Sequence, residues 1–597
     1  MLVEEQTKVN PSWFESPVRR VSTSGGTAPF FRLNLTEEGL KQLGCRGIEI
    51  DKNYWIGKDL SHAQDEKDFY LQVLRIRERS ERDDGNKRDV TEGICLLENF
   101  MFDYLGVLEA KSVEQDGKHG ICQLLVMRNL RNNYDSFRML DLKIGEKTAQ
   151  AGWKGKSRMS ALKHLVMDGL SNSVSEGYRL AGFDGCSEAF ESMHPLMDIL
   201  ATDEVKNIST SAVSSTKRSS VQTSVGLEID QSQVKLAKRI MLNSLDGTEM
   251  LRHFLDLHME EMMGLALEDH LSPTEVAEIV SHELMSKLIS LAVTCHKVHI
   301  PQKWIGSSVA VAYDSCFFPS RSSSHEDDIR SRVLVNIFDW GRSELLTAKE
   351  YEDLTKEDAD DRDKYWDLYR AGIDQLSYNA TRFYFHQFSN STGWKMVTIQ
   401  VMDFDSMSFD DYIGTVEIPL PDLSDSSALK ALGENKAYKL VPRKLTGIAA
   451  AVLGSELFCS ISWVKFPSES RLVGVWRVSI DRAVNLPRMD LVANSSDAYC
   501  MVMATTDAKE SFHRQHFHQQ TCIKARTLNP QWGETIDIPV ARRGNDSSLM
   551  SELTANGISS IDDHNIPNLF EWHNEYFHFS DQNMKRWTSS LKNGTVQ

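Results

Sequence analysis

The stretch Phe137-Arg-Met-Leu-Asp141-Leu-Lys143-Ile-Gly145 is a short apolar run with two charged side chains near its end. Its length and the turn residues around it predict a strand. In an extended chain, residues two apart project to the same side, so Asp141 and Lys143 are expected to face one cleft. A carboxylate can orient or deprotonate an attacking hydroxyl, and an ammonium can neutralise a transferring phosphoryl group. Taken alone, the pattern fits a surface salt pair equally well.

Two later segments place polar residues beside apolar strands. They read Ile305-Gly-Ser307-Ser308-Val-Ala-Val-Ala-Tyr-Asp314 and Val335-Asn-Ile-Phe-Asp339-Trp-Gly341. The apolar runs 309–313 and 333–338 predict a β-hairpin with a long connection. Asp339 ends its strand and is a candidate Mg²⁺ ligand, because Mg²⁺ in phosphoryl-transfer sites is held by one or two carboxylates plus substrate phosphates. Small hydroxyl side chains such as Ser308 would let a phosphate or a metal-bound water approach.

In combination, these segments resemble the inositol polyphosphate kinase family. The stretch 137–145 matches the family signature Pro-x-x-x-Asp-x-Lys-x-Gly, with Phe137 in place of the proline. Ser307-Ser308-Val309-Ala310 resembles the family's Ser-Ser-Leu-Leu element, and Phe338-Asp339-Trp340 its Ile-Asp-Phe element. Three further matches keep the family's order over about residues 55–380: the hinge at Met127-Arg128-Asn129-Leu130, the strand at Gly177-Tyr-Arg-Leu-Ala-Gly182, and a late helix at 363–376. Arg128 stands where the family's hinge has glutamate.

The resemblance implies a two-lobed α+β kinase fold that binds ATP and Mg²⁺ between its lobes. The hinge would hold adenine near Met127 and Asn129. A lysine on an N-terminal strand would grip the ATP phosphates, with Lys58 as the first candidate and Lys52 as the second.

The resemblance also implies roles for the residues of the cleft. Asp141 and Lys143 would act on the inositol phosphate and its attacking hydroxyl, and Arg179 would join Lys143 in binding the substrate. Asp339 would be a direct Mg²⁺ ligand with Ser308 close to the metal. Further positive charge could come from Lys154, Lys156 and Lys163.

Acidic residues in the C-terminal third resemble the calcium ligands of C2 domains. The segment from Trp394 to Gly414 resembles the second half of a C2 domain, and residues 472–540 resemble the first half. Clustered carboxylates repel one another unless a cation neutralises them, and Ca²⁺ takes six to eight oxygen ligands. The expected Ca²⁺ ligands are Asp403, Asp405 and Asp411 from the first segment and Asp490 and Asp497 from the second.

The two C2-like halves occur in reversed order along the chain, and three explanations remain open. A circularly permuted sandwich would join both halves, and the complete ligand set favours it. Two incomplete C2 domains would result from a truncated or misjoined gene. A domain swap between two chains is the third explanation.

The domain organisation follows from these resemblances and from composition. Residues 1–45 form an N-terminal lead-in, of which 1–30 are expected to be mostly unstructured, and 46–385 form the kinase-like domain. Within it, 205–226 is a flexible Ser/Thr-rich insertion, and helical periodicity extends from residue 231 to about residue 291. The second C2-like half occupies 386–466, the first half 467–545, and a polar tail 546–597.

Composition narrows the class of protein. The chain has 597 residues and a net charge of 67 − 85 = −18, which argues against a general nucleic-acid binder. No transmembrane helix and no secretory signal are expected. Nine cysteines without a Cys-x-x-Cys pair suggest free thiols in a reducing compartment. We expect a cytoplasmic protein that can lie peripherally at membranes, with the nucleus left open.

The primary hypothesis is an inositol polyphosphate kinase that uses ATP and Mg²⁺ and is recruited to anionic membrane lipid by a C2-like module, with Ca²⁺ as a further ligand there. The alternative is a non-catalytic calcium- and phospholipid-binding scaffold with a degenerate kinase fold. A third hypothesis is a kinase for another small hydroxylated substrate. The resemblance does not transfer the inositol phosphate isomer or the position phosphorylated.

Overall fold

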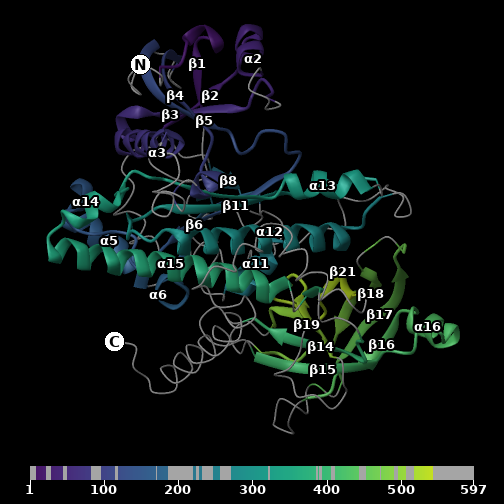
Figure 1. The fold of residues 1–597 in the computed structure, drawn as a ribbon. Coiled ribbons are helices and arrows are strands. Elements are labelled where there is room, and N and C mark those ends of the chain that lie inside the picture. The colour runs from purple at the N-terminus through teal and green to yellow at the C-terminus, as the bar shows by residue number, and fades with distance from the viewer. Residues whose placement is uncertain are drawn as a thin grey trace.

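The computed structural model describes two lobes and a C-terminal β-sandwich (Figure 1). None of the helices in its described part is long and apolar enough to span a membrane. The described residues are 8–21, 29–44, 50–82, 94, 96–113, 119–169, 171–185, 220–222, 228–230, 247–255, 270–320, 323–384, 387–388, 393–404, 411–442, 452, 454–468, 470, 472–489, 495–505 and 517–541.

The N-terminal lobe is a small closed barrel with strand order β1-β2-β3-β5-β4. Its core contains Phe31, Leu33 and Val126. Helix α3 (Gln64–Arg82), between β3 and β4 in the sequence, packs its buried side chains into the core of the second lobe. The expectation of a mostly unstructured stretch 1–30 is wrong for residues 8–21, because β1 pairs with both β2 and β4; residues 1–7 and 22–28 lie outside the described residues. The bounds are β1 (Val18–Val21), β2 (Phe30–Leu33), α2 (Glu37–Gly44), β3 (Trp55–Asp59), β4 (Tyr104–Val113) and β5 (His119–Arg128).

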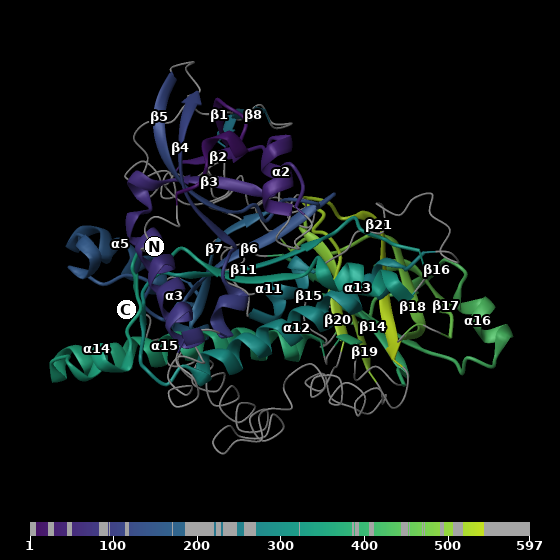
Figure 2. The ribbon, with the colours of Figure 1, turned by 45° about the horizontal axis from the view of Figure 1, so that its top comes forward.

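The second lobe is built on a four-stranded sheet with order β12-β11-β6-β7. Two long helices pack together beside this sheet, α12 (Pro273–Lys297) and α15 (Lys356–Tyr384) (Figures 1 and 2). Ser272 starts α12 with a capping box that it forms with Glu275, which supplies partners for amide groups that lack them in the first turn. The strand bounds are β6 (Phe137–Ile144), β7 (Tyr178–Asp184), β11 (Ser308–Asp314) and β12 (Leu334–Phe338).

Strand β6 explains how the sequence positions its charged residues. Every second residue of β6, from Arg138 to Ile144, is buried, whereas Asp141 and Lys143 belong to the alternate, less buried set. The prediction that these two side chains share one side is therefore confirmed. The predicted hairpin is also confirmed, since β11 pairs antiparallel with β12 and the connection contains helix α13 (Ser323–Ser331).

Smaller elements complete the first two lobes. Helix α11 (Gly247–Phe254) lies within the region predicted to be helical, whereas 231–246 and most of 205–226 fall outside the described residues. The remaining elements are η1 (Pro11–Trp13), η2 (Leu60–His62), η3 (Glu98–Phe100), η4 (Trp153–Gly155), α5 (Arg158–Gly169), α6 (Ser173–Glu176), β8 (Ser220–Gln222), β9 (Glu228–Asp230), β10 (Lys303–Trp304), β13 (Ser343–Glu344) and α14 (Ala348–Glu352).

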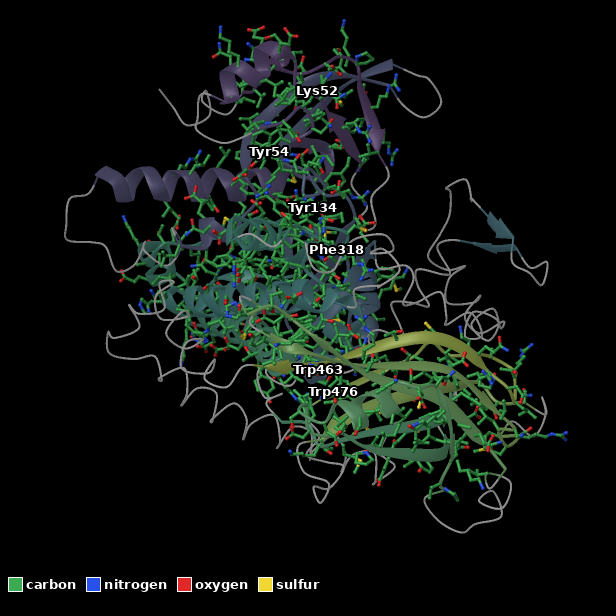
Figure 3. All side chains as sticks on the ribbon, turned by 90° about the vertical axis from the view of Figure 1, so that its right-hand side faces the viewer. Lys52, Tyr54, Tyr134, Phe318, Trp463 and Trp476 are labelled. Atoms are coloured by element: carbon green, nitrogen blue, oxygen red, sulfur yellow. The ribbon has the colours of Figure 1, made fainter. Side chains whose placement is uncertain are left out.

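The C-terminal part is one sandwich of two four-stranded sheets, with orders β15-β14-β19-β20 and β16-β17-β18-β21. Each sheet takes two strands from each C2-like half, and one hydrophobic core joins residues of both, including Ile399 and Val478. Trp463 and Trp476 are cross-strand neighbours in it (Figure 3). The bounds are β14 (Met396–Asp403), β15 (Asp411–Pro419), α16 (Ser426–Leu432), β16 (Lys436–Lys439), β17 (Glu456–Lys465), β18 (Leu472–Val484), β19 (Ala498–Thr505), β20 (Phe517–Gln520) and β21 (Gln531–Ala541).

This sandwich has the arrangement that a circular permutation predicts, because strands from both halves complete each other's sheets. The predicted fold class, α+β followed by an all-β sandwich, is confirmed. The predicted tail 546–597 lies outside the described residues.

Candidate active site between the lobes

A cavity of about 670 Å³ lies between the barrel and the second lobe. Its apolar wall includes Ile56, Met127 and Phe338, and its charged wall gathers side chains from both lobes. The charged and histidine residues that line it are Arg32, Lys58, Glu66, Arg128, Arg131, Asp141, Lys143, Lys156, His164, Asp339 and Arg342. The cavity thus combines an apolar surface suited to a flat ring, such as a nucleobase, with a cluster of cations suited to phosphate groups.

Lys143 and Asp339 meet at the base of this cavity. The Lys143 ammonium donates to the carbonyl oxygen of Gly306 at 2.6 Å and forms an ion pair with Asp339. Asp339 has a backbone φ of 67°, a left-handed conformation that is uncommon for a residue with a Cβ. Strained backbone of this kind is often found at functional sites, where the surrounding structure holds it in place.

The two aspartates of the cavity differ in their pKa. Burial acts to raise the pKa of Asp339, but the charges of Lys143 and Lys58 outweigh it and lower the pKa to about 2. Burial raises the pKa of Asp141, with Lys143 opposing it. Asp141 Oδ1 is buried without a hydrogen-bond partner. One carboxylate is therefore kept ionised, while the other is better able to accept a proton.

Lys58 is held by Glu66, a residue that sequence reasoning did not identify. The two charges form a buried ion pair at 2.5 Å, with side chains only 11% and 2% exposed. Lys58 Nζ also lies 3.9 Å from Asp339 Oδ1. Burial acts to lower the pKa of Lys58, but Glu66 and Asp339 raise it overall, so the amine stays charged. This lysine therefore bridges the barrel, helix α3 and the base of the cavity.

The carboxylates present fit a Mg²⁺ ion. Asp339 opens onto the cavity and stays ionised, and Asp141 offers an unpartnered oxygen there. Mg²⁺ commonly takes one or two carboxylates and completes its shell with substrate phosphates and water. Within the described residues, no group of three or more His, Cys, Asp or Glu side chains could hold a metal without such help.

Several other residues predicted to bind ligands do not line the cavity. Lys52 pairs with Glu15 on the barrel surface at 2.6 Å and does not line the cavity (Figure 3). Arg179 is 6% exposed, is bound to Asp168, and is absent from the cavity lining. Ser308 is fully buried beside the cavity floor and does not line it either. The geometry therefore favours Lys58 over Lys52 and does not place Arg179 or Ser308 against a ligand.

The hinge residues line the cavity but are partly engaged with the barrel. The Asn129 amide donates to the carbonyl oxygen of Tyr54 at 2.7 Å, and its side-chain Nδ2 donates to the carbonyl oxygen of Asn53 at 3.0 Å. The Arg128 amide donates to the carbonyl oxygen of Asp103. Asn129 thus fixes the hinge to the barrel, while Met127 supplies apolar surface.

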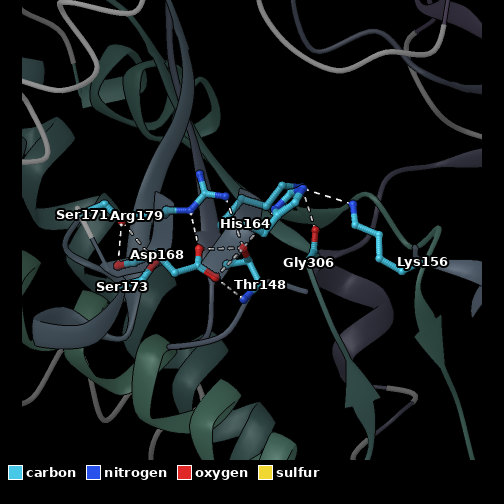
Figure 4. Close-up of polar contacts among 9 residues, drawn as sticks. Thr148, Lys156, His164, Asp168, Ser171, Ser173, Arg179 and Gly306 are labelled. Atoms are coloured by element: carbon cyan, nitrogen blue, oxygen red, sulfur yellow. Dashed lines mark hydrogen bonds and ion pairs between the residues drawn. The ribbon is translucent and has the colours of Figure 1, made fainter. Parts of the chain in front are cut away.

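A hydrogen-bonded chain beside the cavity orients His164 and Lys156 (Figure 4). Lys156 Nζ lies 3.1 Å from His164 Nε2, and an ammonium can only donate, so this nitrogen accepts. The proton of the neutral ring then lies on Nδ1, which faces Thr148 Oγ1 at 3.4 Å. Thr148 in turn donates to Asp168, the partner of Arg179. Arg179 thus acts on the cavity through this chain rather than directly.

This chain predicts a pH-dependent stability. Burial, with Lys156 and Arg179, lowers the pKa of His164 from 6.5 to about 4. The unfolded chain therefore binds a proton before the folded chain does, and stability falls as the pH drops from 6.5 to 4. The expected loss is about 1–3 kcal/mol. Urea unfolding at pH 7 and pH 4.5 should show this loss of unfolding free energy in the wild type and in the control His296→Gln. The loss should be smaller in His164→Gln. Equal losses in all three proteins would contradict the assignment to His164.

Trp153 fixes the loop that carries Lys156. Its indole Nε1 donates to the carbonyl oxygen of Arg342 at 2.8 Å, and Lys303 Nζ lies 3.8 Å from the centre of a Trp153 ring. The Lys156 amide donates back to the Trp153 carbonyl oxygen at 2.9 Å. Because Lys156 and Arg342 both line the cavity, Trp153 positions two of its cations.

Removing this support should weaken the binding of polyanions in the cavity. For the phosphotransferase proposed below, we expect Trp153→Ala to raise the KM for a phosphorylated acceptor about tenfold, with a smaller change in kcat, because the cations are displaced but the carboxylates are not. Trp153→Phe keeps an aromatic ring for Lys303, so its KM for the acceptor should lie between that of Trp153→Ala and that of the wild type. Steady-state kinetics with each substrate varied in turn check this. A rise confined to the KM for ATP would show that Trp153 supports a different part of the cavity.

The C2-like acidic residues that are described converge on one end of the sandwich. Asp403 Oδ1 accepts a hydrogen bond of 2.6 Å from the amide of Asp497, although the two residues belong to different halves. Asp411 lies opposite Asp403 in the β14–β15 ladder. Asp405 and Asp490 lie outside the described residues. Three of the five predicted Ca²⁺ ligands therefore share one edge.

Known proteins resemble this chain in two ways: solved structures are similar to about half of it, and a family model matches its C-terminal part. No curated protein sequence matches the chain. A solved inositol phosphate multikinase from S. cerevisiae, in complex with ADP and Mn²⁺, is similar at 15% identity and a TM-score of 0.29, covering 48% of this chain and 90% of that one. A second inositol phosphate multikinase structure is similar at 14% identity and a TM-score of 0.24, covering 51% of this chain and 97% of that one.

The C2 domain family model matches residues 378–433 and 474–564. Both matched segments contribute strands to the single sandwich. The C-terminal part of this chain is therefore a C2 domain.

Proposed function

We propose that this chain is an ATP-dependent phosphotransferase that acts on a hydroxyl (or a phosphate) of an inositol phosphate. One observation carries the proposal: Lys58, Asp141, Lys143 and Asp339, which come from three separate sequence segments, line one cavity between two lobes. Lys156 and Arg342 add the positive charge that a polyanionic acceptor requires. We further propose that the C2 domain recruits the protein to anionic lipid, and that the protein is cytoplasmic.

In the proposed reaction, an acceptor hydroxyl oxygen attacks the γ-phosphorus of ATP. A new O–P bond forms, the bond to the bridging β–γ oxygen breaks, ADP leaves, and the hydroxyl proton passes to Asp141. The raised pKa of Asp141 suits this role, because a base is most effective when its pKa lies close to the working pH. Lys58 and Lys143 neutralise the phosphate oxygens from opposite lobes. When bound at Asp339, Mg²⁺ supplies further charge neutralisation.

The test is phosphate transfer from labelled Mg²⁺-ATP to a panel of inositol phosphates, using the purified full chain. Transfer would establish the reaction and identify the acceptor. Hydrolysis of ATP with no transfer to any inositol phosphate would favour a different small hydroxylated acceptor. Neither reaction from a folded chain would favour the calcium- and phospholipid-binding scaffold, for which vesicle sedimentation with Ca²⁺ or with EDTA is the next measurement.

A further inference from the structure

The outer side of helix α5 exposes a group of large apolar side chains. Met159, Leu162 and Leu165 follow one another at spacings of three and are 67%, 54% and 55% exposed. Val174, on the adjoining α6, is 62% exposed. Single exposed apolar residues are ordinary on soluble proteins. Here, however, four of the seven large apolar side chains that are exposed in the described chain lie on two neighbouring helices.

The charge around this apolar group differs from that of the rest of the chain. Residues 147–167 contain five Lys or Arg and no Asp or Glu, although the whole chain carries a net charge of −18. Arg158 and Lys163, on α5 itself, are both exposed. An acidic protein is repelled from an anionic bilayer, so Arg158 and Lys163 beside the apolar side chains mark a place where that repulsion is locally reversed.

We propose that the outer side of α5 and α6 is a membrane-docking surface for anionic lipid, separate from the C2 domain. Apolar side chains enter the boundary between headgroups and acyl chains, while flanking Lys and Arg meet the lipid phosphates. Charge complementarity selects an anionic occupant over an uncharged or basic one, and the exposed apolar side chains between the cations suit the boundary of a bilayer rather than a polar protein surface. Figure 2 shows α5 at the outer edge of the molecule and the C2 domain at the opposite end, so the two contacts can be separated by experiment.

The proposed docking surface and the cavity share helix α5. Ser160 and His164 line the cavity from the same helix that carries the apolar group on its other side. A bilayer bound to α5 would therefore lie at the rim of the cavity. This inference goes beyond the proposed function, because vesicle binding is measured without any reaction.

The test is sedimentation of the full chain with phosphatidylcholine vesicles that contain or lack phosphatidylserine. EDTA is present throughout, so that calcium-dependent binding by the C2 domain does not contribute. The variant Met159→Ser/Leu162→Ser/Leu165→Ser should lose affinity for the anionic vesicles by about tenfold to a hundredfold. The control Ile121→Ser/Leu423→Ser changes exposed apolar residues elsewhere, 74% and 43% exposed, and should bind like the wild type.

A charge variant and a measurement of size keep the proposal falsifiable. Arg158→Glu/Lys163→Glu should abolish the preference for phosphatidylserine, and added salt should weaken wild-type binding. Wild-type protein that does not sediment with anionic vesicles, or a triple variant that sediments like the wild type, would overturn the proposal. So would a wild-type dimer on size exclusion that the triple variant converts to monomers, because a second copy would then occupy this face.

Discussion

Replacing Asp339 with asparagine is expected to reduce phosphate transfer by about a thousandfold or more. The carboxylate pairs with Lys143, lies 3.9 Å from Lys58 and is kept ionised by both. Asparagine keeps the size and tolerates the left-handed backbone at this position, so the substitution removes charge without requiring a new conformation. The loss should therefore appear in kcat, while urea unfolding changes little.

The matched control for this experiment is Asp367→Asn. Asp367 is 66% exposed and pairs only with the neighbouring Arg370 on α15 within the described contacts, so its loss should leave activity unchanged. Labelled-phosphate transfer with saturating ATP separates kcat from binding. If Asp339→Asn keeps more than about a tenth of wild-type kcat, Asp339 does not hold the metal and the proposed site is wrong.

Replacing Lys58 with methionine is expected to abolish activity and also to destabilise the fold. Glu66 is 2% exposed and would be left as an uncompensated buried carboxylate, which costs about 3–5 kcal/mol. Burial already raises the pKa of Glu66 against the opposing charge of Lys58. Without Lys58 the pKa of the Glu66 carboxyl should rise further above that of the unfolded chain, so the variant should become more stable as the pH falls toward 5.

A second substitution separates the two effects. In Lys58→Met/Glu66→Met both buried charges are gone, and the free energy of unfolding should return to within about 1–2 kcal/mol of the wild type while activity stays lost. Lys52→Met is the control, because Lys52 is 54% exposed and its pair with Glu15 contributes little. Recovery of activity in the double variant would show that Lys58 serves the fold rather than the phosphates.

Sequence analysis placed residues in the cavity where the local sequence pattern determines the side of a strand to which a side chain points. Alternation along β6 put Asp141 and Lys143 on the cavity side, and the end of β12 put Asp339 beside them. Lys58 was preferred over Lys52, and only Lys58 lines the cavity. The shared side of Asp141 and Lys143 follows from strand periodicity, which depends on near neighbours alone, whereas Lys58 was expected from the family resemblance.

The residues that were missed depend on contacts between distant segments. Glu66 is one of several acids near the start of α3 and becomes distinctive only when the barrel brings Lys58 against it. Arg179 was expected at the substrate from the family resemblance of strand 177–182, but Asp168 from α5 engages it. The first barrel strands were overlooked because four-residue strands separated by Pro and Gly carry too little alternation to be recognised.

The interleaving of the C2 domain has a consequence for synthesis of the chain. Strand β14 can pair with β15 early, but its second partner, β19, exists only after Thr505 has been synthesised. Until then β14 to β17 expose apolar residues and open strand edges, which are the features that promote aggregation. A message that ends between β17 and β18 would therefore yield the two lobes joined to half a sandwich, and such a product is expected to be removed by quality control rather than to persist as a folded protein.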